Sequence, residues 1–77
     1  MAVPMAKSIT RDTARKRLLS MPPEQRAAVL KNCGDARHTV RHILIDDMAP
    51  EQYGKRFNCN GPAMLDIALE RVSRILA

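Results

Sequence analysis

The 77-residue chain carries 13 basic and 8 acidic side chains, a formal net charge of +5 at pH 7, and is 45% hydrophobic but only 3% aromatic. This composition is typical of a folded globular protein rather than a disordered tail, and the length allows only one small domain. It excludes a large enzyme with a deep cleft, and no stretch approaches the roughly 18 consecutive apolar residues of a membrane span. Because no nucleophile–base set and no glycine-rich phosphate loop is visible, we expect neither an enzyme nor a bound cofactor.

The beginning of the chain lacks helical periodicity. We therefore expect residues 1–8 to form a flexible leader and residues 9–77 to form a single all-α domain. The leader has no long apolar segment, so a secretory signal is not expected. Two cysteines in a chain without such a signal favour a reducing compartment, and we expect a cytoplasmic protein.

Prolines and capping residues divide the first two thirds of the chain into three helices. The first is expected from about Thr10 to Ser20, where the Pro22-Pro23 pair stops it. The second begins near Pro23 and ends at Gly34. Asp35 is expected to cap a third helix over residues 35–48. Its predicted core residues follow helical spacing: Ala36, Val40, Ile43, Leu44 and Met48.

The last third of the chain predicts two more helices separated by a turn. A short helix restarts at Pro50, and the residues from Asn58 to Gly61 indicate a turn, because Asn tolerates left-handed backbone angles and Gly prefers them. Pro62 opens the last helix, whose apolar stripe comprises Leu65, Ala68, Leu69, Val72, Ile75 and Leu76. Part of this stripe is a candidate homodimer seam. No strand-like alternation is present, so the predicted fold is a small bundle of about five helices.

Residues 50–69 have the features of a helix-turn-helix unit. Gly54 is small where the second helix would cross the first, and Asn58 suits a left-handed position four residues later. Residues 35–48 supply the helix that normally packs across such a pair. The apolar residues expected to hold the two helices together are Tyr53, Phe57, Cys59, Met64 and Ile67.

More narrowly, this stretch resembles the C-terminal helix-turn-helix of bacterial sigma factors and of phage antitermination-type regulators. The resemblance covers roughly residues 20–76 and is carried by residues 49–57, by residues 68–72 and by the proline-containing entry at residues 21–26. It implies a phage- or mobile-element-type regulator whose second helix enters the major groove of DNA. Of the matching base-contacting positions, only Asn60 could read adenine, and Asp66 would repel phosphates. The remaining two positions are Pro62 and Ala63.

The charge distribution favours a polyanionic partner. Residues 1–41 hold nine basic and three acidic side chains, whereas residues 42–77 hold four and five. Such a basic half suits double-stranded DNA, because each phosphate contact releases counterions, although a solvated helix face is the alternative. The predicted DNA-binding residues are Arg11, Arg15, Lys16, Arg17, Lys55, Arg56, Asn60, Arg71 and Arg74.

A protein-binding inhibitor or adaptor is the alternative function. In that case the acidic second half would contact a basic, nucleic-acid-binding surface of a host protein from the transcription or defence machinery. Asp46 and Asp47 fall near the C-terminal end of the third helix, where carboxylates are unfavourable and have no evident structural reason. The predicted partner-binding residues are Asp46, Asp47, Glu51 and Asp66.

Four metal-capable residues, Cys33, His38, His42 and Cys59, could close a zinc site if the turn folded back on the third helix. The spacing of the two histidines places them on one helix face. Cys59 nevertheless occupies an apolar position of the helix-turn-helix, and Cys33 lies at a helix end. These structural roles are the favoured interpretation, and no metal site is predicted.

Overall fold

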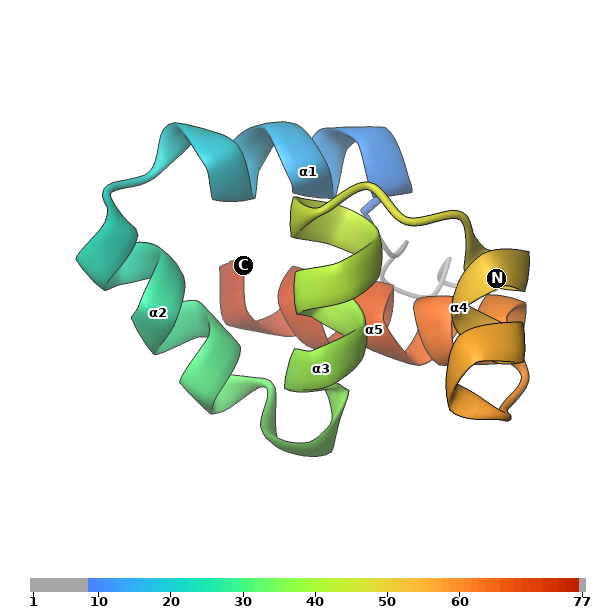
Figure 1. The fold of residues 1–77 in the computed structure, drawn as a ribbon. Coiled ribbons are helices and arrows are strands. Elements are labelled where there is room, and N and C mark those ends of the chain that lie inside the picture. Colours follow the sequence, from blue (N-terminus) through green and yellow to red (C-terminus); the bar gives the residue numbers. More distant parts are fainter. Residues whose placement is uncertain (1–8, 77) are drawn as a thin grey trace, which may run out of the picture.

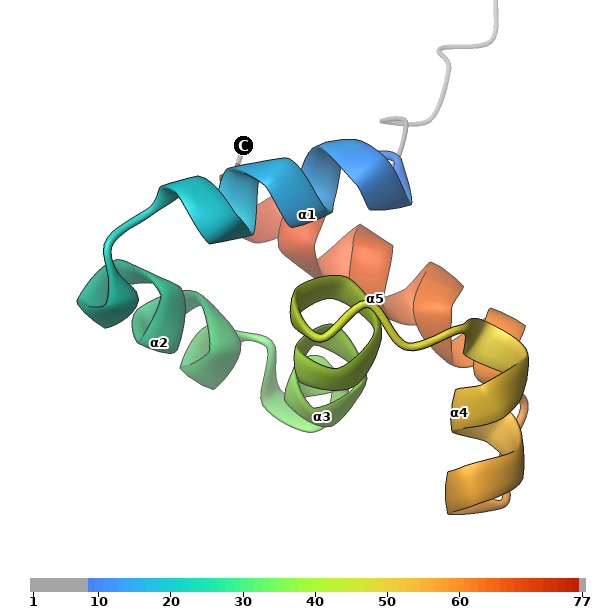
Figure 2. The ribbon, with the colours of Figure 1, turned by 45° about the horizontal axis from the view of Figure 1, so that its top comes forward.

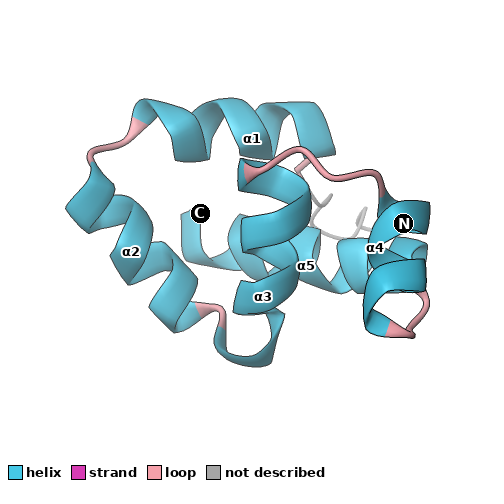
Figure 3. Cartoon of the chain, viewed as in Figure 1, coloured by secondary structure: helices cyan, strands magenta, loops and turns pink. Residues whose placement is uncertain are grey.

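The computed structural model describes residues 9–76, and every regular element in this part of the chain is helical (Figure 3). The predicted all-α bundle is therefore confirmed. The predicted leader, residues 1–8, lies outside the described residues. Within residues 9–76, no helix combines the length and the apolarity needed to cross a bilayer.

The first two helices begin and end at the predicted signals. Helix α1 spans Arg11–Ser20 and helix α2 spans Pro23–Asn32. The Thr10 hydroxyl accepts a hydrogen bond from the Thr13 N–H at 3.2 Å and so caps α1. Pro23 occupies the first turn of α2, and Gly34 follows its end with a φ of 60°, a left-handed value that suits glycine.

The third helix differs from the prediction at both ends. A 3₁₀ turn, η1 (Gly34–Ala36), leads into α3 (Arg37–Thr39), which continues as the π-helical segment η2 (Val40–Ile45). The predicted capping role of Asp35 is wrong, because Ala36 already has helical dihedral angles and no side chain caps the junction. At the C-terminal end of η2, the Asp46 N–H donates to the carbonyl of Arg41, five residues earlier, at 2.9 Å. The helix ends at Ile45 rather than at residue 48.

The remaining helices surround this central one. Helix α2 lies on one side of α3 and helix α4 (Pro50–Phe57) on the other, while α1 lies across the end of the α3–η2 helix (Figure 1). Helix α5 (Gly61–Leu76) passes behind α3 in both views (Figure 2). The central helix consequently has one side toward α5, and α2 and α4 flank it.

The core is formed by the helix faces that the sequence predicts, with one exception. Ala36, Val40, Ile43 and Leu44 are buried, but Met48 is only half-buried, because it follows the end of the helix. On α5, Ala68 and Val72 are buried, and four further apolar residues pack partly against the core: Leu65, Leu69, Ile75 and Leu76. Most of the predicted dimer seam is therefore engaged within the chain, and the homodimer stays a prediction.

Candidate nucleic-acid interface

Helices α4 and α5 meet at a tight turn with the predicted geometry. Asn58 ends α4 in the left-handed conformation, with φ 54° and ψ 55°. The Cys59 N–H donates to the Gly54 carbonyl at 2.9 Å. A Cβ atom on Gly54 would lie 2.6 Å from the carbonyl oxygen of Cys59. The predicted close approach at Gly54 is thus confirmed.

Gly61 makes a second close approach, which the sequence does not predict. Its φ is not positive, so Asn58 alone supplies the left-handed residue of the turn, and the expectation of left-handed angles at Gly61 is wrong. A Cβ atom on Gly61 would overlap the carbonyl oxygen of Pro50. Gly61 therefore allows the start of α5 to pass directly over the start of α4.

Two of the apolar residues predicted to hold α4 and α5 together do not do so. Cys59 is exposed, and Ile67 keeps 43% of its surface accessible. Both expectations are wrong, because the face of α5 that packs inward runs through Gly61, Ala68 and Val72 instead. Ile67 therefore lies on the outward side of α5.

Aromatic rings fill the space between α3 and α4. Tyr53 is buried, and its hydroxyl lies 2.9 Å from Thr39 Oγ1 and 3.0 Å from His38 Nδ1. The half-buried Phe57 ring packs edge-on against His38, with centroids 4.7 Å apart, and against His42 at 5.0 Å. This aromatic cluster (His38, His42, Tyr53 and Phe57) links α4 to the central helix.

The surroundings of His42 lower the pKa of its ring. Partial burial lowers its pKa, and the positive charges of His38, Arg41 and Arg56 lower it further, while Asp46 acts in the opposite direction. The two arginines come from different helices, since Arg41 is in η2 and Arg56 is in α4. Arg56 Cζ lies 5.8 Å from the centroid of the Phe57 ring, which packs against His42 at 5.0 Å, so Arg56 lies beside the aromatic rings.

The metal-capable residues do not form a site. Among the described residues, no three His, Cys, Asp or Glu side chains are arranged to hold an ion. His38 and His42 belong to the aromatic cluster, with ring centroids 4.4 Å apart. Cys33 is buried, which raises the pKa of its thiol despite the opposing charge of Arg71, whereas Cys59 is exposed.

On α1, two of the four predicted DNA-binding residues serve the fold. Arg15 Nη1 donates to the carbonyls of Leu44 and Ile45 at 2.9 and 2.7 Å, at the C-terminal end of the central helix. Arg11 Nη2 donates to Asp47 Oδ1 and to the Met48 carbonyl, both at 3.1 Å. Lys16 forms only an exposed ion pair with Asp12, and Arg17 is exposed without a partner in the described chain.

The predicted DNA-binding residues of α5 are also engaged. Asn60 Oδ1 accepts a hydrogen bond from the Ala63 N–H at 3.0 Å and caps the helix. Arg71 donates to the Cys33 carbonyl at 2.8 Å, and Arg74 pairs with Glu70 at 3.6 Å. Asp66, which lies on the same helix, is exposed. The N-terminal half of α5 consequently presents a carboxylate and no cation.

The acidic residues predicted to bind a partner are not equivalent. Asp47 has a structural role, because it pairs with Arg11 at 3.1 Å and approaches Arg15 Nε at 4.0 Å. Asp46, Glu51 and Asp66 are exposed and form no hydrogen bond or ion pair through their side chains within residues 9–76. The structure therefore separates Asp47 from the other three.

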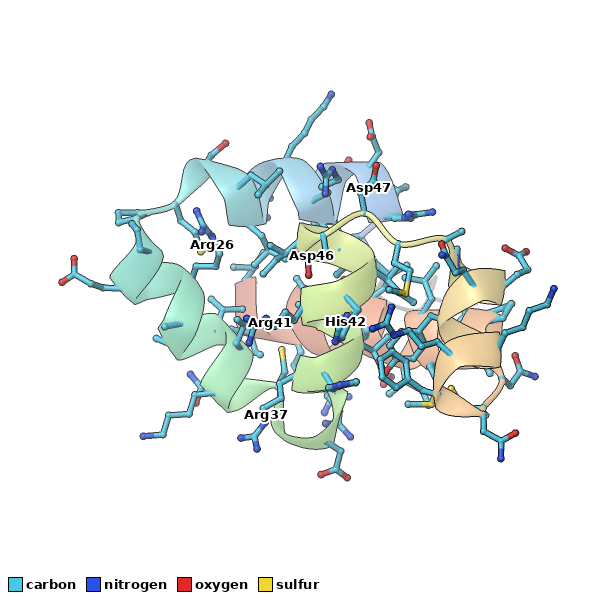
Figure 4. The ribbon with its side chains drawn as sticks, in the orientation of Figure 1. Arg26, Arg37, Arg41, His42, Asp46 and Asp47 are labelled. Atoms are coloured by element: carbon cyan, nitrogen blue, oxygen red, sulfur yellow. The ribbon has the colours of Figure 1, made fainter. Side chains whose placement is uncertain are left out.

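Three exposed cations outside the set predicted from the sequence lie together on the side of the central helix away from α5. Arg37 and Arg41 extend from the α3–η2 helix (Figure 4), and Lys31 of α2 lines the same groove. None of these three, nor Arg56 of α4, forms an ion pair or hydrogen bond through its side chain within the described residues. We name these four residues, Lys31, Arg37, Arg41 and Arg56, the cationic face.

A local signal could have revealed part of this face. Arg37 and Arg41 are one helical turn apart, and neither has an acidic residue three or four positions away. Their like charges therefore repel each other, and neither arginine has a carboxylate partner at these spacings on its own helix. Arg26 was also missed, but its guanidinium donates to the carbonyls of Leu18 and Met21 at the end of α1, at 2.9 and 3.1 Å.

Comparison of the chain with protein-family models, with curated proteins and with solved structures gives no significant match. The resemblance to sigma factors and antitermination-type regulators thus stays a prediction from the sequence.

Proposed function

We propose that the protein is a small DNA-binding regulator of the phage or mobile-element type that binds duplex DNA mainly through phosphate contacts of the cationic face. One observation carries this proposal: Lys31, Arg37 and Arg41 line one groove, Arg56 extends from the neighbouring α4, and none of these four exposed cations has a carboxylate partner in the described chain. Guanidinium groups suit phosphates because they donate bidentate hydrogen bonds. Unpaired cations also keep their counterions until a polyanion displaces them.

In this proposal the α4–turn–α5 unit is a helix-turn-helix scaffold that contributes little base recognition. Asp66 disfavours the approach of phosphates to the N-terminal half of α5, and the Asn60 side chain is occupied as a cap. Binding is therefore expected to depend weakly on DNA sequence. A cytoplasmic location belongs to the same proposal and is supported by Cys33 and Cys59, which are both free thiols.

The protein-binding alternative is favoured by a different observation. Asp46, Glu51 and Asp66 expose carboxylates that have no partner within residues 9–76. In this second candidate function, these three residues would contact a basic surface of a host transcription or defence protein, and Asp47 would only support the fold. The negative charge of these residues complements a basic surface, and complementary charges raise the rate at which two proteins associate.

Binding to nonspecific duplex DNA at several salt concentrations tests the proposal. Wild-type affinity should fall steeply with salt, and Arg37→Ala/Arg41→Ala should flatten the slope by about two units, since each lost phosphate contact removes roughly 0.9. Lys16→Ala/Arg74→Ala is the matched control. It removes the same charge from cations that are already paired, so the slope should change much less.

Two results would contradict the DNA-binding proposal. The first is absence of binding to duplex DNA at low salt, and the second is an equal loss in the control variant. An Asp46→Asn/Glu51→Gln/Asp66→Asn variant distinguishes the alternative. It should bind DNA more tightly if DNA is the partner, and it should lose biological activity while DNA binding is retained if the partner is a basic host protein.

A further inference from the structure

An open groove of about 340 Å³ lies between α2 and the central helix. Ala27, Leu30 and Lys31 line it from α2, and Arg37, His38 and Arg41 line it from α3 and η2. Figure 4 shows Arg41 extending from the central helix toward α2. The groove thus lies on the side of the molecule that carries the cationic face.

The floor and the rim of this groove differ in chemistry. Ala27 and Leu30 supply aliphatic surface, and Leu30 also packs against the hydrophobic core, which fixes the floor in place. Lys31, Arg37 and Arg41 supply three positive charges, and no acidic residue lines the groove. Phosphate binding alone would explain the rim but would not require an aliphatic floor.

The pairing of floor and rim restricts the class of ligand. A volume of about 340 Å³ accommodates one or two large apolar side chains, and small-ligand pockets begin at about 300 Å³. Ala27 and Leu30 have no polar groups that would read the edge of a nucleobase, and the Nδ1 atom of His38, which also lines the groove, already contacts the Tyr53 hydroxyl at 3.0 Å. A ligand that fills the floor and satisfies the rim therefore needs an apolar anchor flanked by carboxylates.

We propose that the α2–α3 groove binds an acidic segment of another protein through an apolar anchor residue, and that this segment and DNA compete for Arg37 and Arg41. Docking itself depends only on the groove. The competition rests on the proposed DNA-binding function, since it requires both ligands to use the same two arginines. An acidic partner would thereby regulate DNA binding by occupying the cationic face.

Fluorescence anisotropy with two defined probes tests the docking. The first probe is a fluorescein-labelled peptide composed of Asp, Glu and Leu, and the second has every Leu replaced by Ser. The wild-type protein should bind the first probe at least tenfold more tightly, because only Leu can fill the floor. Equal affinities would show that charge alone drives binding and would overturn the proposal.

A pair of neutral substitutions on α2 localises the site. Ala27→Gln should fill the groove and weaken binding of the Leu probe at least tenfold, while Ala28→Gln should not, because Ala28 is exposed on the same helix but does not line the groove. Circular dichroism should show that both variants retain their helices. A wild-type affinity for Ala27→Gln would overturn the proposal.

Ala27→Gln and Ala28→Gln also distinguish a peptide in the groove from a nucleobase or a second copy of the chain. They separate the docking proposal from the DNA-binding proposal as well. Neither substitution changes the net charge, so both should bind duplex DNA as the wild type does. Loss of oligothymidylate binding specific to Ala27→Gln would assign the floor to a nucleobase, and dissociation of an oligomer by Ala27→Gln would assign it to a second copy of the chain. Either result would overturn the peptide site.

A displacement experiment tests whether the peptide and DNA compete for the protein. Unlabelled Leu peptide should release labelled duplex DNA from the wild type and from Ala28→Gln, and at least tenfold more peptide should be needed for Ala27→Gln. If the peptide binds but the protein never binds DNA, docking is supported and both the DNA-binding function and the competition fail. If both bind without displacing each other, the competition is overturned.

Discussion

At the scale of single residues, two glycines control how closely α4 and α5 approach. A Cβ atom on Gly54 would lie 2.6 Å from a backbone oxygen, and one on Gly61 would overlap another. Backbone atoms cannot move aside as the end of a flexible side chain can. The two positions therefore require glycine for space, although neither has a positive φ.

The first prediction concerns these glycines. Gly61→Ala and Gly54→Ala should each destabilise the protein by about 1–3 kcal/mol or more, with the larger effect at Gly61, despite the better helix propensity of alanine. Urea denaturation measures the free energy of unfolding. A Gly61→Ala protein as stable as the wild type would show that α5 can start further from Pro50 without cost.

The second prediction follows from the lowered pKa of His42. Unfolded chains protonate this ring near its ordinary pKa of about 6.5, whereas the folded protein protonates it only at lower pH. Stability from the neutral ring is therefore fully present above about pH 6.5 and is lost as the pH falls toward the folded-state pKa. Lowering the pH from about 7.5 to about 5.5 should reduce the urea midpoint of the wild type.

His42→Gln provides the control for this pH dependence. Its midpoint should fall less between the same two pH values, because glutamine does not take up a proton. The remaining decrease would come from other groups. If both proteins lost the same amount, protonation of His42 would not contribute.

At the scale of elements, the end of the central helix is held by α1. Arg15 donates to two carbonyls that the helix itself leaves without partners, and Arg11 binds Asp47 just beyond. Asp47 has a φ of 62°, a left-handed value that is uncommon for a residue other than glycine. The ion pair with Arg11 thus stabilises the chain where it turns away from the helix.

The third prediction tests this contact. Arg15→Ala should destabilise the protein by about 1.5–3 kcal/mol, because two hydrogen bonds from a charged donor are lost. The neighbouring Arg17→Ala should change stability by less than about 0.5 kcal/mol, since Arg17 is exposed and has no partner in the described chain. Thermal denaturation of the two variants provides the comparison. Similar melting temperatures would contradict the structural role of Arg15.

The sequence predicted the elements better than it predicted their side-chain contacts. Prolines and caps act within a few residues, so the limits of α1 and α2 could be predicted, as could the left-handed turn at Asn58. The π-helical segment could not, because no local residue signals the wider hydrogen bonds of η2. Arg15 and Asp47 looked like surface charges, since the groups they bind are 29–36 residues away in the chain.

At the scale of the whole molecule, composition alone cannot separate the basic residues that hold the fold from those that stay unpaired. Arg11, Arg15, Arg26 and Arg71 donate to backbone carbonyls and hold helix ends or loops. The cationic face does not contribute in this way. A run of charge in the sequence therefore pointed to α1, where only Arg17 is unpaired, whereas Lys55 and the cationic face, the other unpaired cations of the described chain, lie on α2, the central helix and α4.

Such a face should weaken the fold that carries it. Arg37 and Arg41 are one turn apart on a helix, where like charges destabilise by about 0.2–0.5 kcal/mol, and Lys31 lies across the groove. No carboxylate of the described chain pairs with them. The repulsion should be strongest at low ionic strength, because the Debye length is about 30 Å at 0.01 M salt and about 3 Å at 1 M.

The fourth prediction is that removing these charges stabilises the protein while weakening its proposed activity. Arg37→Gln/Arg41→Gln should raise the melting temperature by ~3 °C at low salt, since glutamine has a similar helix propensity and 1 kcal/mol shifts a domain of this size by about 4–8 °C. The gain should disappear near 1 M salt. Lys16→Gln/Arg74→Gln should show no gain, because both residues already pair with a carboxylate. A stabilised double variant that also loses DNA affinity would identify Arg37 and Arg41 as residues that serve binding at the expense of stability, whereas a destabilised one would assign them to the fold.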